Sequence, residues 1–393
     1  MLRLLLVLFC TSFFLVGCES GTEPETMPDQ GDVLGKLHLG TYTPELFATL
    51  SANFGYSLEL DYSVEAYQVE YQTLSPDGER TVASGALLVP QEVDTFSVLS
   101  WQHGTLLERN GVGSRNPLFY AIDAIMYAGN GYLVSVPDYL GLGSSEILQP
   151  YLLYEPTATA VVDMLRAVLI ISEESNYFLN NKFYLAGYSG GGYATLATQK
   201  YMENVLPGEF NLLGVAPMAG PYDLLQTSHM ILSQESFSEP ALMAFAITAY
   251  DTYLGWGRLA DIFRSPFNAD VTTYFNGGQT LQSVNELLPE ARSQLYQDTF
   301  IQNLLDGTDP LVEAALVENS LTDWTPQTPI RFFHGTADEI VPYPIATAAR
   351  DSLRSKGATS VELMPVINGT HIEAYFPSLL LSLAWIDSID AVN

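Results

Sequence analysis

Cysteine is nearly missing from this chain of 393 residues, which contains only Cys10 and Cys18. Both lie in the first 18 residues, so the rest of the chain can form no disulfide bond and no metal site based on cysteine. A protein without disulfides needs a large hydrophobic core for its stability. With 47% hydrophobic residues, the chain can supply one, either as one enlarged domain or as a domain with a sizeable insertion.

Positive charge is also scarce. The 15 Lys and Arg residues stand against 45 Asp and Glu residues, which gives a formal net charge of −30. The acidic residues are dispersed, unlike those of a disordered acidic tail. Binding to nucleic acid or adsorption to anionic lipid needs basic patches, so the composition argues against both kinds of partner. A salt-rich habitat and simple solubility both account for such a surface.

One apolar run stands out at the N-terminus, where Arg3 precedes the segment Leu4 to Phe14. The run is too short to span a bilayer comfortably and predicts an export signal. Its continuation, Leu15-Val16-Gly17-Cys18, resembles the lipobox of bacterial lipoproteins. That resemblance implies a signal peptide over residues 1–18 and lipidation of Cys18. An ordinary cleaved signal and a short membrane anchor are the alternatives.

The composition then predicts how the rest of the chain is divided. Residues 19–32 are rich in Gly, Pro, Thr and acids and are expected to form a flexible tether. A core follows in two parts, residues 33–222 and 324–393. Between them, residues 223–323 have helical spacing and no clean strand, which predicts a helical cap inserted over the carboxyl ends of the strands. A separate helical domain is the alternative.

Short apolar runs and helical stretches alternate through the two core parts. A hairpin is expected around the turn Ser75-Pro76-Asp77-Gly78, with strands over 65–74 and 82–89. Strands alternating with helices predict an α/β fold with a mostly parallel central sheet flanked by helices. Further strands are expected over 95–101, 132–136, 182–186, 213–219, 330–333 and 360–366, and helices over 157–171, 194–205, 343–356 and 372–389.

The strand over 182–186 runs into Gly187-Tyr188-Ser189-Gly190-Gly191 and then into a helix. This order fits the G-x-S-x-G nucleophile elbow, in which a tight turn presents the serine hydroxyl above the sheet. The serine backbone is strained there, and side chains two residues away on either side would collide with neighbouring elements. The alternative is a glycine turn that merely ends a strand, with a solvated serine.

A serine hydroxyl needs a base, a carboxylate that orients the base, and donors for the oxyanion. Of the five histidines, His371 alone follows the last expected strand in a loop. Asp338 follows the preceding strand, so the order is Ser189, Asp338, His371, as in folds built on a nucleophile elbow. Glu339 competes with Asp338, which is favoured because it directly follows the His-Gly-Thr-Ala turn.

The other histidines have structural interpretations. His38 precedes the expected sheet, and His229 begins the expected insertion. His103 and His334 each precede a glycine at a strand end, where an imidazole often braces a loop. We therefore assign no catalytic role to these four.

With these motifs the chain resembles an α/β-hydrolase, and within that fold a bacterial relative of secretory lipases and carboxylesterases, over about residues 64–389. The resemblance implies that Ser189 is the nucleophile, Asp338 the orienting acid and His371 the general base. It implies one oxyanion N–H from Gly190 and a second from Thr105. The motifs that carry it are His103-Gly104-Thr105, Asp138-Tyr139-Leu140-Gly141-Leu142-Gly143, the elbow, His334-Gly335-Thr336-Ala337-Asp338 and Gly369-Thr370-His371.

One motif departs from the family pattern. Its loop reads His-Gly-Thr where many esterases have His-Gly-Gly-Gly, so the second donor, Thr105, rests on a weaker pattern than the triad. Asp138 and Tyr139 lie at a strand end, where ligands bind in α/β sheets, but a role in bracing its glycine loop is favoured for Asp138. The substrate-binding residues stay open. The aromatic candidates for an apolar acyl pocket are Trp101, Tyr188, Tyr193, Tyr253 and Trp256.

The sequence thus predicts an exported serine hydrolase of carboxylic esters in the bacterial cell envelope, held to a membrane only by its N-terminal lipid. The expected substrate is a small-molecule ester with an apolar acyl group, medium or long and neutral rather than small and charged, and no metal or other cofactor is needed. Two alternatives keep the triad but change the reaction: a peptidase of the prolyl-oligopeptidase type and an acyltransferase. A non-catalytic surface lipoprotein that uses the fold for binding is the alternative from another class.

Overall fold

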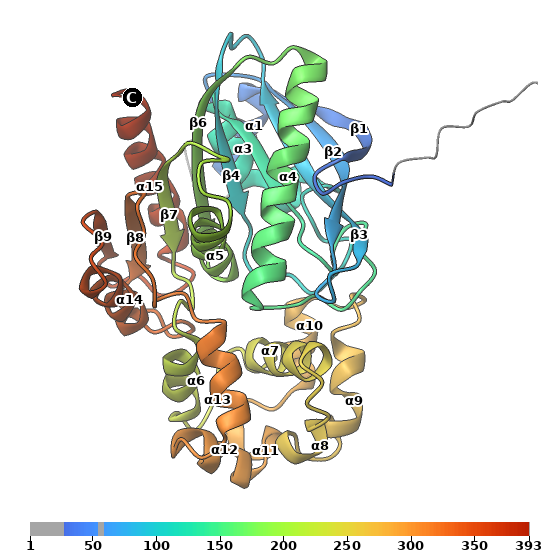
Figure 1. Cartoon of the computed structure of the whole chain (residues 1–393), viewed down its shortest axis with the longest axis vertical. Helices are drawn as coiled ribbons and strands as arrows, with labels where there is room; N and C mark the ends of the chain where they lie inside the picture. Colours follow the sequence, from blue (N-terminus) through green and yellow to red (C-terminus); the bar gives the residue numbers. More distant parts are fainter. Residues whose placement is uncertain (1–26, 54–58, 393) are drawn as a thin grey trace, which may run out of the picture.

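The computed structural model describes residues 27–53 and 59–392. The predicted signal peptide, Cys18 and most of the predicted tether lie outside these residues. One nine-stranded sheet organises the described chain, with helices on both of its faces and a group of helices beyond one end (Figure 1). Within the described ranges, no helix is both long enough and apolar enough to cross a membrane.

The sheet is mixed and mostly parallel. The pairs β1/β2, β2/β3 and β3/β5 are antiparallel, and every pair from β5 to β9 is parallel. This arrangement confirms the predicted fold class. In sheet order the strands are β1 (Val33–Tyr42), β2 (Val64–Leu74), β3 (Arg80–Pro90), β5 (Leu133–Pro137), β4 (Phe96–Gln102), β6 (Leu179–Tyr188), β7 (Leu212–Met218), β8 (Ile330–Gly335) and β9 (Val361–Val366).

The predicted hairpin is present between β2 and β3. Its strands pair antiparallel from Val64 opposite Pro90 to Leu74 opposite Arg80. The turn closes with a hydrogen bond of 2.9 Å from the backbone N–H of Gly78 to the carbonyl oxygen of Ser75, a typical length for such a bond. Gly78 has a φ of +79°, a conformation that glycine adopts without steric cost.

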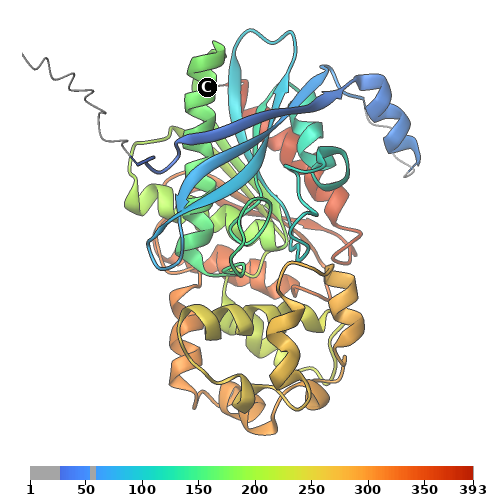
Figure 2. The same cartoon turned by 90° about the vertical axis from the view of Figure 1, so that its right-hand side faces the viewer.

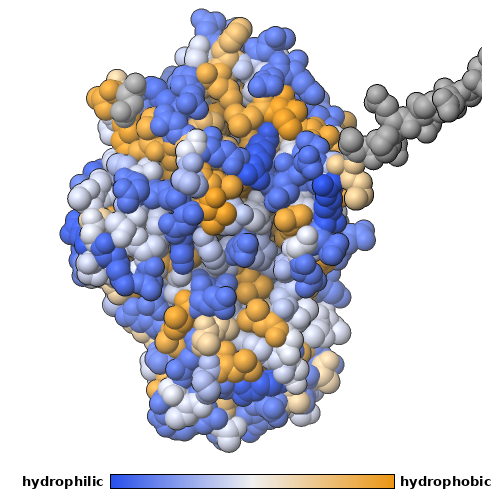
Figure 3. All heavy atoms as spheres, viewed as in Figure 1, coloured by the Kyte–Doolittle hydropathy of each residue, from blue (hydrophilic) through white to orange (hydrophobic). Residues whose placement is uncertain are grey.

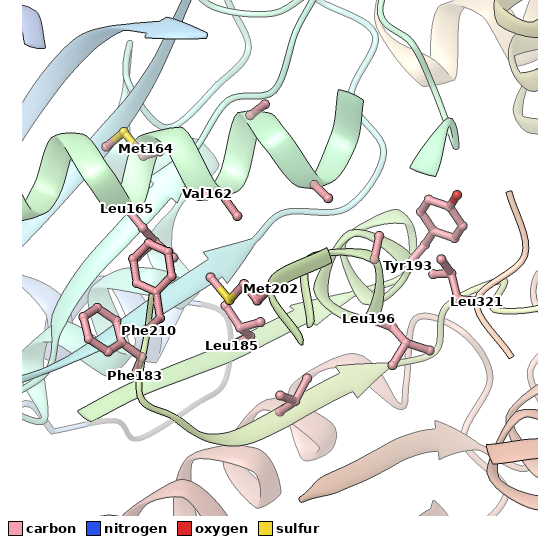
Figure 4. Packing of buried hydrophobic residues seen from close by; sticks show 14 of the residues in the cluster. Val162, Met164, Leu165, Phe183, Leu185, Tyr193, Leu196, Met202, Phe210 and Leu321 are labelled. Carbon is pink, nitrogen blue, oxygen red and sulfur yellow. The ribbon is translucent and has the colours of Figure 1, made fainter. Parts of the chain in front are cut away.

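Helices cover both faces because successive strand residues point to opposite sides. Val98 and Leu185 pack toward α4 (Tyr154–Ser175), α5 (Gly190–Val205) and α14 (Tyr343–Ser355), and Figure 4 shows part of this cluster. Their neighbours Leu99 and Ala186 point to the other face, which α3 (Ile122–Gly129) and α15 (Tyr375–Asp390) cover. The strands buried on both faces therefore read as nearly continuous apolar runs.

Between β7 and β8, residues 224–318 contain the helices that gather at one end of the molecule (Figures 1 and 2). We call residues 223–323 the helical insertion. It has a hydrophobic cluster of its own, which includes Phe245, Phe263 and Tyr296. Its helices are α6 (Leu224–Leu232), α7 (Pro240–Tyr253), α8 (Leu259–Ile262), α9 (Phe267–Tyr274), α10 (Leu281–Leu287), α11 (Arg292–Leu295), α12 (Asp298–Leu305) and α13 (Pro310–Glu318).

Several elements differ from the prediction. β1 was not predicted, because this edge strand contains no fully buried residue and so lacks a clear alternation. His38, expected before the sheet, lies within β1 opposite Tyr67. The helices α1 (Pro44–Asn53), α2 (Pro117–Tyr120) and α3 were also not predicted. The last helix begins at Tyr375 rather than Ile372, since the residues before it form turns.

The last residues of the predicted tether contact the core. The backbone N–H of Gly31 donates to the carbonyl of Gln72 at 2.8 Å, and the Gln30 amide donates to the carboxylate of Asp163 at 3.2 Å. These bonds hold the segment before β1 against β2 and α4, so a free tether would have to lie N-terminal to it.

Candidate active site

Ser189 lies at the turn between β6 and α5, with φ 59° and ψ −122°. Such a backbone conformation is strained for a residue with a side chain and occurs mostly at functional sites. The flanking glycines are required by packing. A Cβ on Gly187 would lie 2.6 Å from the carbonyl oxygen of Gln102, and one on Gly191 would lie 2.0 Å from it. The turn can therefore press against β4 only with glycine at these positions.

The structure brings together the side chains of Ser189, His371 and Asp338. Nε2 of His371 lies 3.0 Å from the Ser189 Oγ, and Nδ1 of His371 lies 2.7 Å from Oδ2 of Asp338. Asp338 comes from the loop after β8, and His371 from the loop after β9. Both side chains are buried, with 8% and 6% of their residue surfaces exposed.

Asp338 is held by donors at both carboxylate oxygens. Oδ1 accepts from the backbone N–H groups of Ile340 at 3.0 Å and Val341 at 2.8 Å. Oδ2 accepts from His371 and lies 3.2 Å from Nε2 of His334, which also contacts the carbonyl of Val341. Burial alone would raise the pKa of Asp338, but the hydrogen bonds from His334 and His371 outweigh it and lower the pKa to about 2. The carboxylate is therefore ionised at neutral pH.

Glu339, the competitor for the acid position, contacts the backbone of His371 instead of its ring. Its Oε2 accepts from the backbone N–H of His371 at 3.2 Å. Nδ1 of the His371 ring is hydrogen-bonded to Asp338, so Asp338 and not Glu339 has the position of an orienting carboxylate.

The loop after β4 lies beside the elbow. A Cβ on Gly190 would lie 2.8 Å from Oγ1 and 3.3 Å from the backbone nitrogen of Thr105. Gly190 is the first residue of α5, where a backbone N–H has no partner within the helix. The backbone nitrogens of Gly190 and Thr105, the two predicted oxyanion donors, therefore belong to neighbouring segments next to Ser189.

Asp138 braces its loop, one of the two roles that the sequence left open. Its carboxylate accepts from the Ser84 hydroxyl at 2.7 Å and from the backbone N–H of Ser114 at 3.2 Å. A Cβ on Gly143, which has a φ of +58°, would lie 2.3 Å from the same carboxylate. His103 braces the same region, since its Nε2 lies 3.2 Å from the carbonyl oxygen of Asp138.

A pocket of about 820 Å³, its open mouth included, leads from Ser189 and Gly190 into the helical insertion. Its walls are largely apolar and come mainly from α6, α7, α12 and α13. The residues lining it include Tyr151, Leu224, Thr227, Ile231, Leu242, Met243, Ala246, Ile247, Tyr250, Trp256, Phe300, Leu304, Val312 and Ile340. Among the described residues, no group of three or more His, Cys, Asp or Glu side chains is suited to hold a metal ion.

Of the five aromatic candidates for this pocket, only Trp256 lines it. Trp101, Tyr188 and Tyr193 are buried in the core, and the Tyr188 hydroxyl donates to the carbonyl oxygen of His371 at 2.6 Å. Tyr253 donates its hydroxyl to the carbonyl of Leu148.

The sequence did hold a signal for the lining residues that were missed. Leu242, Ala246 and Tyr250 recur at helical spacing on α7, and so do Leu224, Thr227 and Ile231 on α6. Side chains at that spacing share one face of a helix.

The secretory lipase family matches residues 122–389, which is more than half of the chain. A protein from Legionella pneumophila of known crystal structure is 28% identical, with a TM-score of 0.85 over 91% of this chain and 98% of that one. The rice cell wall degrading esterase LipA from Xanthomonas oryzae is also 28% identical, with a TM-score of 0.80 over 91% of this chain and 97% of that one.

Among curated relatives, Lipase 10 of Candida albicans is 24% identical over 281 residues, which cover 66% of this chain. The match spans 55% of the length of that lipase. The family match and the geometry of the fold agree: the chain belongs to the secretory lipase family and has its α/β-hydrolase fold.

Proposed function

We propose that the chain is an exported serine hydrolase that cleaves carboxylic esters with an apolar acyl group. The observation that carries this proposal is the pair of hydrogen bonds that links Ser189 through His371 to Asp338, at 3.0 and 2.7 Å. A serine hydroxyl becomes an effective nucleophile at neutral pH only with such a base beside it. Membership of a family of lipases supports the ester bond as the target.

In the proposed reaction, Ser189 Oγ attacks the ester carbonyl while Nε2 of His371 takes the hydroxyl proton. Asp338 accepts from Nδ1–H, which fixes the tautomer and stabilises the imidazolium that forms. His371 then gives the proton to the leaving alcohol, and an acyl-enzyme remains on Ser189. A water molecule then attacks the acyl-enzyme carbonyl while His371 takes its proton; the bond between the acyl carbon and Ser189 Oγ breaks, His371 returns the proton to Oγ, and the acid is released.

The backbone N–H groups of Gly190 and Thr105 are proposed to stabilise the oxyanion. Their neighbouring positions beside Ser189 support this role. Loss of one such donor costs roughly 3 kcal/mol of transition-state stabilisation, or about a hundredfold in rate.

The helical insertion, residues 223–323, is proposed to act as a cap that supplies the acyl pocket to a core made of residues 33–222 and 324–393. The largely apolar walls and the volume of about 820 Å³ favour a medium or long neutral acyl chain over a small charged one. A charged acyl group would lose its hydration there without gaining a partner.

The fluorophosphonate reaction tests the proposed nucleophile, because this probe labels only activated serines. We expect the purified protein to be labelled and Ser189→Ala to remain unlabelled. Ser355→Ala, which removes an exposed hydroxyl at the end of α14, is the matched control and should label like the wild type. Correctly folded wild-type protein that takes up no label would refute the proposal.

The bond specificity needs a second assay on the same preparations. We expect hydrolysis of p-nitrophenyl esters that depends on Ser189, and no comparable turnover of peptide anilides. Faster cleavage of the anilides would instead make the chain a peptidase.

The proposed location in the bacterial envelope depends on Cys18. We expect cells that express the full chain to incorporate labelled palmitate into it, and Cys18→Ala to abolish this labelling. Labelling that persists in Cys18→Ala would rule out this anchor without affecting the proposed catalysis.

A further inference from the structure

The turn before α4 belongs to the core and contacts the helical insertion. Leu152 lies in this turn with a φ of 57°, and its carbonyl oxygen accepts two hydroxyl hydrogen bonds. One comes from Tyr193 in α5 at 2.9 Å, whose hydroxyl is shared with the carbonyl oxygen of Asn319 at 2.8 Å, and the other from Tyr250 in α7 at 2.9 Å. Helices of the core and of the insertion thus both bond the carbonyl group of Leu152. These bonds restrain the turn that carries the preceding residue, Tyr151.

The Tyr151 ring packs within the cluster of the insertion. It stacks on Phe245 of α7, with ring centroids 4.6 Å apart and planes inclined by 12°. Phe245 in turn stacks on Phe275 at 4.7 Å. Only 7% of Tyr151 is exposed. Aromatic rings stacked in this way have little rotational freedom, so the direction of the Tyr151 hydroxyl is well defined.

That hydroxyl points out of the insertion to the loop after β4, where it lies 2.7 Å from Oγ1 of Thr105. The backbone nitrogen of Thr105 is the proposed second oxyanion donor and lies beside Gly190. Burial raises the pKa of Tyr151 more than the hydrogen bond with Thr105 lowers it, so the pKa is about 12. The phenol therefore stays protonated across the neutral range, and the bond to Thr105 is retained there.

We infer that Tyr151 is a positioning residue that holds the Thr105 side chain, and with it the oxyanion loop, in place from the side of the helical insertion. The inference rests on the proposed function, because it assigns a support to a donor proposed there. Tyr151 also lines the pocket, so a role as a mere wall of the acyl site is the competing explanation. The two differ in which kinetic constant changes: a displaced oxyanion donor lowers kcat, whereas a lost wall contact raises KM.

The test is a double-mutant cycle on the whole protein with p-nitrophenyl acetate and decanoate. Tyr151→Phe keeps the ring and Thr105→Val keeps the side-chain shape, so each removes little besides the hydrogen bond. We expect each to lower kcat about tenfold on both esters, with KM changed less than about twofold. The double variant should be no slower than the slower single variant, because both remove one interaction. Thr105→Ser, which restores the hydroxyl, should recover at least about half of the wild-type kcat.

Tyr127→Phe is the matched control, since it also removes a buried bond between two hydroxyls. The Tyr127 hydroxyl lies 2.6 Å from Oγ of Ser382. This bond links α3 to α15 on the face of the sheet that these two helices cover. We expect this variant to lose thermal stability to an extent similar to Tyr151→Phe while keeping its kcat. A drop in kcat of the same size in Tyr127→Phe would show a general effect of destabilisation and overturn the inference.

Two other results would overturn it as well. One is a rise in KM that grows with acyl length at unchanged kcat, and the other is full additivity of the two losses. Fluorophosphonate labelling distinguishes failure of the positioning role of Tyr151 from failure of the proposed function. If the wild type and Tyr151→Phe both label and turn over equally, only the positioning role fails; if the folded wild type does not label, the proposed function fails first.

Discussion

At the scale of single residues, the buried carboxylate of Asp338 lies within reach of four nitrogen donors. Two backbone N–H groups at Oδ1, together with His371 and His334 at Oδ2, surround one buried carboxylate. Donors of this kind stabilise the ionised form and fix its orientation toward His371.

The first prediction concerns the orienting charge. Asp338→Asn keeps the size of the side chain but removes the charge that stabilises the imidazolium and selects the tautomer. We expect kcat on p-nitrophenyl butyrate to fall by about three to four orders of magnitude, with KM little changed. Glu339→Gln is the control, because an amide oxygen can still accept from the backbone of His371, and it should lose less than about threefold. Equal losses in the two variants would contradict the assignment of Asp338 as the orienting acid.

The second prediction concerns acid stability. The pKa of Asp338 is lowered in the folded protein from its ordinary 3.8 to about 2, so the ionised carboxylate stabilises the fold above pH 4. This stabilisation is lost as pH falls through the folded pKa. We expect the free energy of unfolding of the wild type, measured relative to that of Asp338→Asn in urea titrations, to fall by roughly 2 kcal/mol between about pH 4 and pH 2. A constant difference between the two proteins over that range would contradict it.

At the scale of elements, α6 and α7 each present one largely apolar face to the pocket. On α7, Leu242, Ala246 and Tyr250 recur at intervals of one turn and line the space beyond Ser189. Ala246 has the smallest side chain of the three, so a larger side chain at this position would fill part of the pocket and shorten it.

The third prediction uses that position. Ala246→Phe should lower kcat/KM on p-nitrophenyl decanoate about tenfold or more, while acetate hydrolysis stays within about twofold, because only the long chain needs the filled space. Thr252→Phe, which adds the same ring on the exposed side of α7, should leave both esters unchanged. An equal effect of Ala246→Phe on the two esters would show that the acyl chain lies elsewhere.

At the scale of the whole molecule, acidic side chains outnumber basic ones and give the chain a net charge of −30. Hydrophilic side chains cover much of the face in Figure 3, and the apolar ones lie in several separate groups among them. Excess charge of one sign keeps a protein soluble but destabilises the compact state through self-repulsion.

The fourth prediction follows from this repulsion. Raising sodium chloride from about 10 mM to about 0.5 M shortens the Debye length from roughly 30 Å to a few Å, and should raise the Tm by a few degrees. Sodium chloride and sodium sulfate compared at equal ionic strength separate screening from the exclusion of sulfate from the surface. A Tm that falls or stays constant in sodium chloride would mean that the acidic groups are already compensated locally.

The sequence alone was sufficient for the strands β2 to β9 and for the helices α4, α5, α14 and α15 of the core, but not for β1 or for α1, α2 and α3. Runs that are buried on both faces are apolar throughout, and the glycines at 187 and 191 identify a turn that tolerates no side chain. The same local signals predicted that Ser189, Asp338 and His371 follow the ends of three strands, which are β6, β8 and β9 in the structure. β1 escaped prediction because an edge strand without a buried face has no periodic signal.

The tertiary structure decided everything that depends on which segments meet. Ser189 and His371 are 182 positions apart in the chain, and Asp338 and His371 are 33 positions apart. These pairs come within hydrogen-bond distance only because the sheet brings the ends of its strands to one edge. The choice of Asp338 over Glu339, the bracing role of Asp138 and the contact of Tyr151 with Thr105 are likewise matters of side-chain direction. Spacing along the chain encodes which face of an element a residue occupies, whereas the partner across that face is set by packing.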